Sequence, residues 1–329
     1  MKKEILETLK KNSEIFVSGE ELSNKIGVTR AAVWKHIKQM KEEGYEIEAV
    51  SRKGYRLTGE PDILDAKSLE IELNCQSLTK KVIHYDNIDS TNTQAKILAS
   101  RGACEGTVLL AEEQTGGRGR LGRHWIAPKG TGIWMSIILK PDIEPSEAAK
   151  ITQIAAAAAT MAVREITGCE AGIKWPNDII VKGKKICGIL TEMSGELNSI
   201  SYIVVGIGIN VNMGMEDFPY ELREKATSLK ECSGKIVSRK KLVISVLTHF
   251  EKYYFNFLES KNVRSSVDIC KKYSVTLGKQ VKIMQRGMEM LGEALDITED
   301  GELMIKNDKG EIEKIVSGEV SVRGINGYI

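Results

Sequence analysis

The first 62 residues follow a pattern of short amphipathic helices that ends in one hairpin. Ser18 and Glu21 form an S-x-x-E capping box, which predicts the start of a second helix, and Gly27 is placed to end that helix. In the third helix, which follows at once, apolar residues recur at i, i+4 and i+7. Residues 45–57 then predict two strands joined by a four-residue turn.

Residues 63–273 alternate between apolar strand candidates and helices, which is typical of an α+β domain with a mixed or largely antiparallel sheet. The expected strands are Lys81–Tyr85, Thr107–Glu112, Gly132–Leu139, Ile186–Glu192 and Ile200–Val205, and the expected helices are Asn92–Arg101, Ser146–Thr167 and Arg239–Ser260. Residues 274–329 show short strands with glycine turns, which predicts a small, SH3-like β-barrel. The sequence thus predicts an α+β multidomain protein, with a first linker at Glu60-Pro61-Asp62.

The third predicted helix carries a basic surface. From Thr29 to Lys41 it contains no acidic residue, and Arg30, Trp34 and Lys38 share one face. Three short helices followed by a hairpin that carries Arg52 and Lys53 predict that residues 1–62 form a winged helix-turn-helix DNA-binding domain. In such a domain the third helix enters the major groove of DNA, and the basic wing, here the hairpin, contacts phosphates or the minor groove. The residues expected to contact DNA are Arg30, Trp34, Lys35, Lys38, Arg52 and Lys53. Trp34 could instead cover the hairpin, and the sequence does not decide between these roles.

Composition and charge limit the class of protein. Apolar residues make up 42% of the 329 residues, enough for a substantial core, and the net charge of +2 means that any basic site must be local. The six cysteines contain no C-x-x-C pair, which argues against a zinc site or a disulfide framework and fits a reducing cytoplasm. The longest alanine-rich run, Ile154–Val163, is shorter than the roughly 20 residues that cross a bilayer. We therefore expect a cytoplasmic protein with no membrane partner.

The loop from Thr115 to Arg123 is the strongest chemical signal, because three arginines alternate with glycines. Gly117, Gly119 and Gly122 match the G-x-G-x-x-G spacing, but no helix follows to hold a pyrophosphate, so we reject a dinucleotide site. Glycine lets the backbone approach an anion closely, and arginine adds forked donors. We therefore expect a loop that binds a phosphate or acyl phosphate; the alternative is a mobile surface loop.

The segment Lys174-Trp175-Pro176-Asn177-Asp178 places a lysine, an amide and a carboxylate around a turn that contains proline. A cation beside an acid able to hold Mg²⁺ suits attack on an α-phosphate. Lys174 and Asp178 are therefore candidate catalytic residues, and Asp178 is a candidate magnesium ligand. The alternative is a simple turn with a surface ion pair. Ser90-Thr91-Asn92, taken alone, predicts an ordinary helix cap.

Six motifs together resemble the biotin–protein ligases. They are DSTN (Asp89–Asn92), EEQTGGRGRLGRHW (Glu112–Trp125), KWPNDI (Lys174–Ile179), KKICGIL (Lys184–Leu190), GIGIN (Gly206–Asn210) and SGEVSVRG (Ser317–Gly324). The resemblance covers the whole of the second and third predicted domains. The segments TRAAVWKHI and RKGYRL in the first domain further resemble the bifunctional members of this family, which repress biotin operons.

The resemblance implies an ATP-dependent, AMP-forming biotin–[acetyl-CoA-carboxylase] ligase. Biotin and MgATP would form biotinoyl-5′-adenylate, and biotin would then pass to a lysine of a carrier protein. The implied biotin contacts are Ser90, Thr91, Asn92, Gln114, Arg118, Gly119, Arg120, Lys185 and Gly188. The implied contacts of ATP or the adenylate are Arg120, Arg123, Trp125, Lys174, Asn177, Asn210 and Arg323. Lys174, Asp178 and Arg120 are the residues implied in catalysis.

The resemblance also implies partners. They are the biotin carboxyl carrier protein of acetyl-CoA carboxylase or of another biotin-dependent carboxylase, operator DNA, and a second copy of the chain when the adenylate is bound as corepressor. In some repressor members an aromatic residue after the GIGIN strand stacks on adenine, but the corresponding stretch near Ala226 lacks one. The adenine contact and the coupling of ligand to dimerisation therefore stay open.

Two rival functions also stay open. A lipoate or octanoyl transferase shares the middle fold, although the GRGRLGR loop, the KWPND segment and the C-terminal barrel favour biotin. A ligand-sensing transcription factor without catalysis would not need the charged loop, Lys174 or Asp178.

Overall fold

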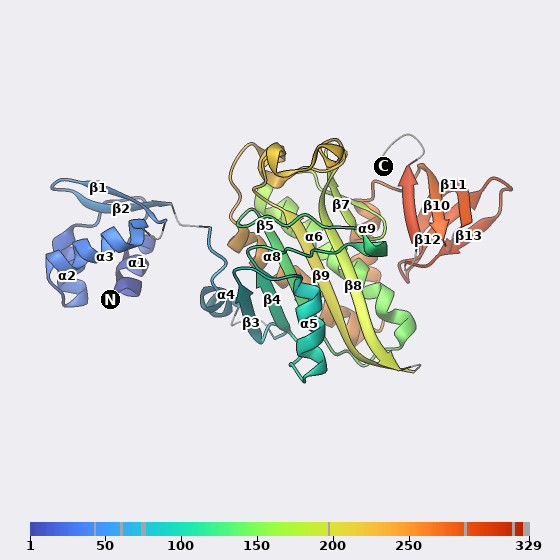
Figure 1. Ribbon diagram of the computed structural model, residues 1–329, viewed down its shortest axis with the longest axis horizontal. Helices are drawn as coiled ribbons and strands as arrows, with labels where there is room; N and C mark the ends of the chain where they lie inside the picture. Colours follow the sequence, from blue (N-terminus) through green and yellow to red (C-terminus); the bar gives the residue numbers. More distant parts are fainter. Residues whose placement is uncertain are drawn as a thin grey trace. The chain divides into compact units, whose positions relative to one another are not determined.

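The computed structural model describes residues 1–42, 44–59, 62–73, 77–196, 198–285, 288–317 and 320–324 (Figure 1). Only the backbone is described for Lys3, Gln285, Met288, Val320, Ser321 and Arg323. The predicted linker residues Glu60 and Pro61 lie outside the described residues. The chain forms two compact units, Met1–Ile63 and Leu64–Ile329, and each has a hydrophobic core of its own.

The first unit contains α1 (Lys2–Lys11), α2 (Gly19–Ile26), α3 (Arg30–Glu42), β1 (Glu46–Val50) and β2 (Gly54–Gly59). The Ser18 hydroxyl accepts a hydrogen bond from the backbone N of Glu21 at 3.0 Å, and Gly27 ends α2 in the left-handed conformation. The buried apolar residues of α3 join the core of this unit, and β1 pairs with β2 in antiparallel orientation. The predicted winged helix-turn-helix is confirmed.

The second unit contains every predicted strand and helix of the later domains. Its helices are α4 (Ala66–Leu73), α5 (Thr91–Ser100), η1 (Arg120–Gly122), η2 (Pro145–Glu147), α6 (Ala148–Thr167), η3 (Met215–Asp217), η4 (Tyr220–Leu222), α7 (Leu229–Ser233), α8 (Arg239–Ser260) and α9 (Arg264–Lys272). Its strands are β3 (Lys81–Tyr85), β4 (Thr107–Ala111), β5 (Gly132–Leu139), β6 (Gly172–Lys174), β7 (Asp178–Val181), β8 (Lys184–Glu196), β9 (Ser199–Asn210), β10 (Gln280–Gln285), β11 (Met288–Ile297), β12 (Leu303–Asn307), β13 (Ile312–Ile315) and β14 (Val320–Gly324).

Within the described residues, seven strands form one mixed sheet in the order β3-β4-β5-β9-β8-β7-β6. Only β3 and β4 run parallel, so the predicted mixed, largely antiparallel sheet is confirmed. Because side chains alternate along each strand, the two faces of the sheet differ. One face, with Ile189, Val205 and Ile207, is covered by α6 and α8. The opposite face, with Leu109 and Val204, carries α5.

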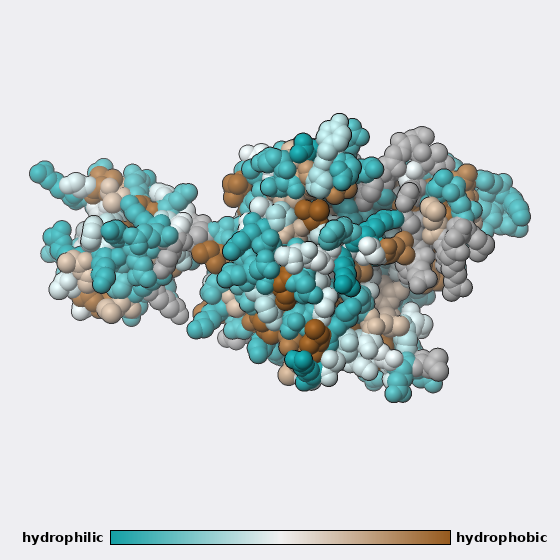
Figure 2. Space-filling model, in the orientation of Figure 1, coloured by the Kyte–Doolittle hydropathy of each residue, from teal (hydrophilic) through white to brown (hydrophobic). Residues whose placement is uncertain are grey.

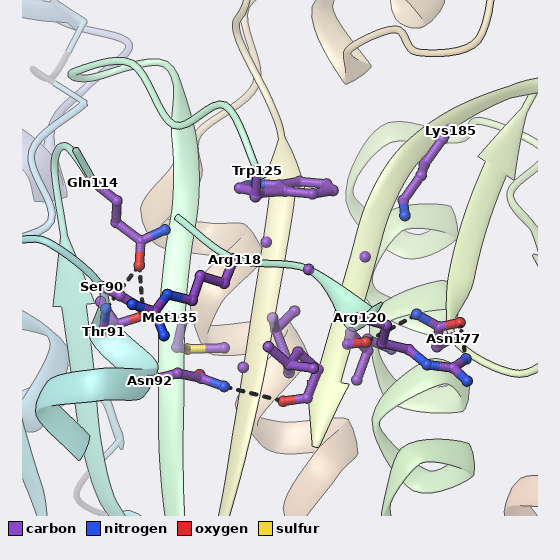
Figure 3. Close-up of a pocket in the computed structure, with 17 residues that line it drawn as sticks. Ser90, Thr91, Asn92, Gln114, Arg118, Arg120, Trp125, Met135, Asn177 and Lys185 are labelled. Carbon is purple, nitrogen blue, oxygen red and sulfur yellow. Dashed lines mark hydrogen bonds between the residues drawn. The ribbon is translucent and has the colours of Figure 1, made fainter. Parts of the chain in front are cut away.

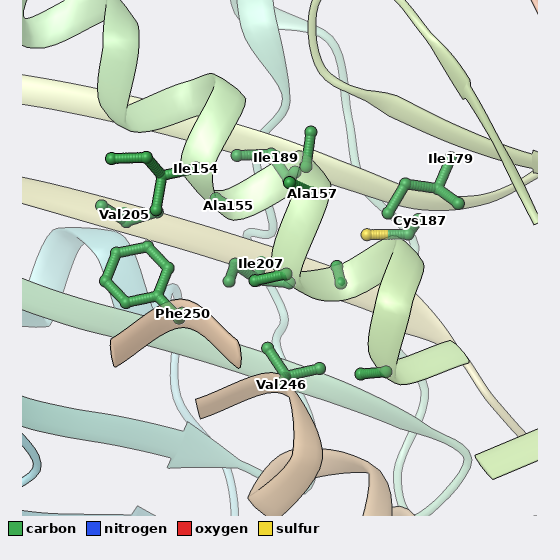
Figure 4. Packing of buried hydrophobic residues seen from close by; sticks show 14 of the residues in the cluster. Ile154, Ala155, Ala157, Ile179, Cys187, Ile189, Val205, Ile207, Val246 and Phe250 are labelled. Carbon is green, nitrogen blue, oxygen red and sulfur yellow. The ribbon is translucent and has the colours of Figure 1, made fainter. Parts of the chain in front are cut away.

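Helix α6 is rich in alanine because it lies between the sheet and α8. Ile154, Ala155 and Ala157 of α6 pack in the same core as Val246 and Phe250 of α8 (Figure 4). Small side chains allow neighbouring elements to approach closely. The alanine-rich run is therefore a core helix.

The described surface gives no sign of a membrane-spanning segment. Hydrophilic residues cover most of the face shown in Figure 2, and hydrophobic residues appear there in separate small patches. Across the described ranges, no helix combines the length and the apolar character that crossing a membrane requires.

The short strands predicted for the C-terminal part are present, and they form an antiparallel sheet in the order β13-β12-β11-β10-β14. The expected SH3-like closure of this sheet into a barrel stays a prediction. Trp175 connects this sheet to the rest of the unit, because its indole Nε1 donates to Gly301 O at 3.0 Å and its backbone N donates to Thr276 Oγ1 at 3.1 Å. Lys150 of α6 also pairs with Asp300 at 2.9 Å. The C-terminal sheet thus belongs to the same compact unit as the larger sheet. The division at 62/63 and 273/274 into three domains stays a prediction.

A buried ion pair joins the end of β4 to the start of α8. Arg239 Nη1 lies 2.6 Å from Glu112 Oε2, and the two side chains are only 3% and 10% exposed. Burial by itself would raise the pKa of Glu112, but hydrogen bonds from His84 and Arg239 and the charge of Arg239 lower it to about 2. Glu112 also accepts a backbone hydrogen bond from Gly130. The pair therefore holds the base of the glycine–arginine loop against α8.

We expect Arg239→Met to lower the free energy of unfolding by about 3–5 kcal/mol, because it leaves a buried carboxylate without its cation. Urea denaturation followed by circular dichroism measures this loss. The double variant Arg239→Met/Glu112→Gln should regain part of the stability, since it removes the unpaired charge. A loss below about 1 kcal/mol, the range of exposed ion pairs, would contradict this role.

The same ion pair predicts a pH dependence of stability. The pKa of Glu112 is about 2 in the folded protein and 4.5 ordinarily, so its carboxylate stabilises the fold above pH 4.5. That contribution is lost as the pH falls from 4.5 toward 2. The difference in unfolding free energy between the wild type and Glu112→Gln should therefore shrink across this interval.

Candidate active site

The main pocket lies on the α5 face of the seven-stranded sheet, where glycines take the place of larger residues. Along β9, Gly206, Gly208 and Asn210 share this face, because alternation sends Ile207 to the core on the other side. In β8, Gly188 is directly opposite Gly208 in the register. Glycines on two neighbouring strands therefore leave a hollow above the sheet.

Two side chains from other segments fill part of this hollow. A Cβ atom at Gly208 would lie 2.7 Å from Cε2 of Trp125, and one at Gly188 would lie 2.9 Å from its Cζ3. A Cβ atom at Gly206 would clash with Oδ1 of Asn92. The glycines therefore make room for Trp125 and Asn92, which both line the pocket (Figure 3).

The first turn of α5 forms the polar end of the pocket. Ser90 caps this helix, and its hydroxyl accepts a long hydrogen bond of 3.5 Å from the backbone N of Thr93. Gln114 Oε1 accepts hydrogen bonds from the backbone N of Thr91 at 2.8 Å and from its hydroxyl at 3.0 Å (Figure 3). The predicted helix cap and Gln114 thus form one corner of hydroxyl and amide groups.

The opposite end of the pocket is basic. Arg120 Nη1 donates to Asn177 Oδ1 at 2.7 Å, and Asn177 Nδ2 donates to Ile189 O at 3.0 Å. Burial lowers the pKa of the Arg120 guanidinium, whereas the nearby Asp178 carboxylate raises it and Arg123 lowers it. Arginine keeps its charge in proteins even so. These contacts hold a cation of the glycine–arginine loop against the KWPND segment.

Lys185 adds a second cation beside Trp125. Its ammonium lies 2.6 Å from Asp178 Oδ1 and 5.3 Å from the centroid of the Trp125 ring. Trp125 in turn packs edge-on against Trp134, with ring centroids 6.3 Å apart. Asp178 also lies opposite Lys174 in the register of β6 and β7. The carboxylate therefore pairs with Lys185 and belongs to the residue that lies opposite Lys174 in the sheet.

One pocket brings together all the residues expected to contact biotin. These lining residues are Ser90, Thr91, Asn92, Gln114, Arg118, Gly119, Arg120, Lys185 and Gly188. Trp125 and Asn177, which were expected to contact ATP, line it as well (Figure 3). The convergence supports a shared site, while the role of each residue stays a prediction.

The remaining residues expected to contact ATP lie elsewhere. Asn210 is buried and donates to Thr227 O at 3.1 Å, and Arg123 is exposed. Lys174 is buried and lines a smaller cavity together with Thr276 of the C-terminal part. The side chain of Arg323 lies outside the described residues, although its backbone belongs to β14.

Sequence reasoning missed the apolar wall of the pocket and the residues behind it. Leu190 shares the pocket face of β8 with Gly188, and Met135, Ile189 and Ile207, whose side chains belong to the core on the other side of the sheet, complete the lining. The buried Ser136 hydrogen-bonds to two lining residues from behind. Apolar residues and glycines alternate along β8 and β9, and this alternation was the signal in the sequence that could have indicated the pocket lining.

All six residues expected to contact DNA are exposed in the first unit. Trp34 is 57% exposed, so it does not serve as a cover for the hairpin, and the Lys38 ammonium lies 5.8 Å from its ring centroid. At the wing, Lys53 and Arg56 lie over the ring of Phe16, at 6.0 and 4.7 Å from its centroid. The third helix and the wing thus present cations and aromatic surface to solvent.

Known proteins match this chain in each of its parts. Residues 85–210 match the Biotin/lipoate A/B protein ligase family, residues 2–56 match an HTH domain, and residues 276–323 match the Biotin protein ligase C terminal domain. The Bifunctional ligase/repressor BirA of Bacillus subtilis is 37% identical over 322 residues, which are 98% of each chain. The chain belongs to the bifunctional ligase/repressor family.

A second relative and a solved structure support the same family. The Bifunctional ligase/repressor BirA of Escherichia coli is 28% identical over 309 residues, 94% of this chain and 93% of that one. The solved structure of biotin protein ligase from Aquifex aeolicus in complex with biotin and ATP is 32% identical, has a TM-score of 0.65, and covers 74% of this chain and 99% of that one. The predicted family is confirmed, together with its combination of ligase and repressor.

Proposed function

We propose that the chain activates biotin with ATP, transfers it to a carrier protein, and represses biotin genes. The observation that carries the ligase half is a pocket with hydroxyl and amide groups at one end and Arg120 and Lys185 at the other. Biotin has a matching polarity, with a ureido ring at one end and a carboxylate at the other. Pockets for such molecules are largely apolar, with few aimed polar groups.

In this proposal the two ends of the pocket have separate tasks. Thr91, Asn92 and Gln114 bind the ureido group, and the apolar wall holds the ring and the valeryl chain. Lys185 and Arg120 bind the carboxylate. Because a carboxylate is a poor electrophile, cations near it and near the α-phosphate assist its adenylation.

The reaction takes place in two steps. The biotin carboxylate attacks the α-phosphorus of ATP, and pyrophosphate leaves, giving biotinoyl-5′-adenylate. The amine of a carrier lysine then attacks the carbonyl carbon and AMP leaves; we propose that the carrier is the biotin carboxyl carrier protein of a biotin-dependent carboxylase. Lys174 stabilises charge on the phosphate in the first step, while Asp178 holds Lys185 in place. Trp125, Asn177, Asn210, Arg123 and Arg323 are the other proposed ATP contacts.

Mg²⁺ enters this proposal as part of the substrate MgATP. The described residues contain no group of three or more His, Cys, Asp or Glu side chains that could hold a metal. Mg²⁺ in ATP-dependent sites is commonly bound by one or two carboxylates together with the phosphates. Asp178 is the candidate carboxylate.

The repressor half of the proposal places the first unit on operator DNA. One recognition helix and one wing contact few bases, so useful specificity requires two copies on a two-fold symmetric site. We propose that biotinoyl-5′-adenylate acts as the corepressor by favouring the dimer. The HTH match and the exposed basic surface support DNA binding.

A lipoate or octanoyl transferase is the second candidate, because the family that matches residues 85–210 includes both kinds of enzyme. The match of residues 276–323 to the C-terminal domain of biotin protein ligases favours biotin.

We expect the purified full-length protein with MgATP to exchange labelled pyrophosphate into ATP only when biotin is added. This exchange reports reversible adenylation and needs no carrier protein. Lipoate and octanoate serve as matched alternative substrates. Exchange with lipoate but not with biotin would replace biotin by lipoate in the proposal.

We expect Lys174→Ala to slow adenylate formation by about 10²–10³-fold, the typical value of one preorganised donor. Its affinity for biotin should change much less, because the charge matters most in the transition state. Single-turnover adenylation and equilibrium binding of biotin separate the two effects. An equal loss in rate and in affinity would make Lys174 a substrate clamp instead.

We expect Lys38→Ala and Lys53→Ala to weaken binding to operator DNA, with a salt dependence reduced by about one unit if each lysine contacts a phosphate. Lys235→Ala, which removes the same charge from the second unit, is the control. Titrations of full-length protein with and without biotin plus ATP measure the coupling, expected at about 1–3 kcal/mol. Coincident curves would exclude the adenylate as corepressor.

A further inference from the structure

A chain of hydrogen-bonding side chains continues behind the polar end of the pocket. The fully buried Ser136 places its Oγ 2.7 Å from Thr91 Oγ1 and 2.6 Å from Asn92 Oδ1. On one side, Thr91 Oγ1 lies 3.0 Å from Gln114 Oε1. On the other side, Asn92 Nδ2 donates to Glu192 Oε2 at 2.9 Å. Thr91, Asn92 and Gln114 line the pocket, and the other two side chains support them from behind.

The amide groups of Asn92 and Gln114 each have one allowed orientation. Asn92 Nδ2 faces the Glu192 carboxylate and, at 3.3 Å, the carbonyl oxygen of Leu190. Both partners only accept hydrogen bonds, so the Asn92 oxygen must face Ser136. Gln114 Oε1 accepts from the backbone N of Thr91 at 2.8 Å, so its oxygen must face Thr91. The two hydroxyl groups therefore stand between two acceptors.

This arrangement is one proton short. Three oxygen–oxygen contacts join Asn92, Ser136, Thr91 and Gln114, but the two hydroxyl groups supply only one proton each. Ser136 donates to Asn92, and without a ligand Thr91 donates to Gln114, so no proton lies between Thr91 Oγ1 and Ser136 Oγ. If Thr91 turns and donates to Ser136 instead, Thr91 Oγ1 and Gln114 Oε1 face each other as two acceptors. Both residues line the pocket. A ligand N–H directed at these two oxygens satisfies them.

We propose that Glu192 is a positioning residue that makes the pocket select a ligand with N–H donors. It does so by holding the Asn92 amide in the orientation that leaves this series of hydrogen-bonding groups with one proton too few. The inference rests on the proposed function, since the ureido N–H groups of biotin are the donors concerned. A lipoyl or octanoyl group offers no such donor and leaves the acceptors unpaired, which weakens its binding.

Two neighbours keep Glu192 in this role. The Lys96 ammonium lies 2.7 Å from Glu192 Oε1, which leaves Oε2 for Asn92. In β8, Glu192 shares the pocket face of the sheet with Gly188 and Leu190, because residues two apart point the same way. The carboxylate thus reaches the back of Asn92 from the strand that also carries part of the pocket wall.

Glu192→Gln tests the proposal with almost no change in size. Lys96 attracts the oxygen of the introduced amide, so its NH₂ group faces Asn92. Asn92 then turns over to accept from this group and gives up its longer, 3.3 Å contact with the carbonyl oxygen of Leu190. Asn92 then donates to Ser136, Ser136 to Thr91 and Thr91 to Gln114, and every contact holds a proton. We expect the Kd for biotin, measured by titration calorimetry on the full-length protein, to rise about tenfold. The KM for MgATP and the Tm should stay at wild-type values.

A double variant separates hydrogen-bond direction from a merely structural effect. In Glu192→Gln/Asn92→Asp, the carboxylate accepts from the introduced amide and from Ser136, so the original direction of the chain returns. We expect most of the lost biotin affinity to return as well. Glu196→Gln removes the same charge from the exposed end of β8 and should bind biotin as the wild type does.

The outcomes distinguish this inference from the proposed function. A wild type that binds no biotin would overturn the proposed function and this inference with it. A wild type that binds biotin no more tightly than Glu192→Gln would overturn the inference alone. A loss in Glu192→Gln with no recovery in the double variant would also overturn it, because Glu192 would then act by charge or packing.

Discussion

The alternation of side chains along β8 and β9 is the constraint on which the site depends. It sends Ile189 and Ile207 into the core beneath α6 and α8, and it sends Gly188, Gly206 and other small residues to the opposite face. A large residue on that face would displace Trp125 or Asn92. A shift of one residue in register would exchange the two faces, filling the pocket and emptying the core together. The stability of the sheet and the presence of the pocket therefore have one cause.

The cations of the site are held in place before any anion arrives. Asp178 pairs with Lys185, and Arg120 is hydrogen-bonded to Asn177, so neither side chain has to be ordered at the moment of reaction. Partial burial of the Arg120 guanidinium, which lowers its pKa, also means that its field is less screened by water. Preorganised charge of this kind stabilises a developing negative charge without further reorganisation. The ion pair of Glu112 with Arg239 extends this order to the base of the loop.

Many of the helices, strands and motif residues could be predicted from the sequence, because they depend on local patterns of residues. Capping residues such as Ser18 and helix ends such as Gly27 behaved as predicted, and β3, β5 and α8 have the predicted bounds. The motif residues of the pocket converged as the resemblance implied. Contacts over long sequence distances could not be predicted in this way. Ser136 and Glu192 belong to strands whose local pattern indicates only burial or exposure, and their partner Asn92 comes from a helix far away in the chain.

The difference between local patterns and contacts over long sequence distances bears on how one fold can serve more than one substrate. An apolar wall discriminates weakly, since a methylene group more or less changes binding by only about 1–3 kcal/mol. A site built to hydrogen-bond a polar group rejects ligands that lack it far more strongly, because its own acceptors are then left unpaired. Selectivity between a ureido ring and a dithiolane or alkyl chain must therefore come from the direction of the hydrogen bonds around Thr91 and Asn92. That direction is set from behind by Glu192, which needs no contact with the ligand. Residues that decide the substrate in this fold can thus lie outside the motifs that define the family.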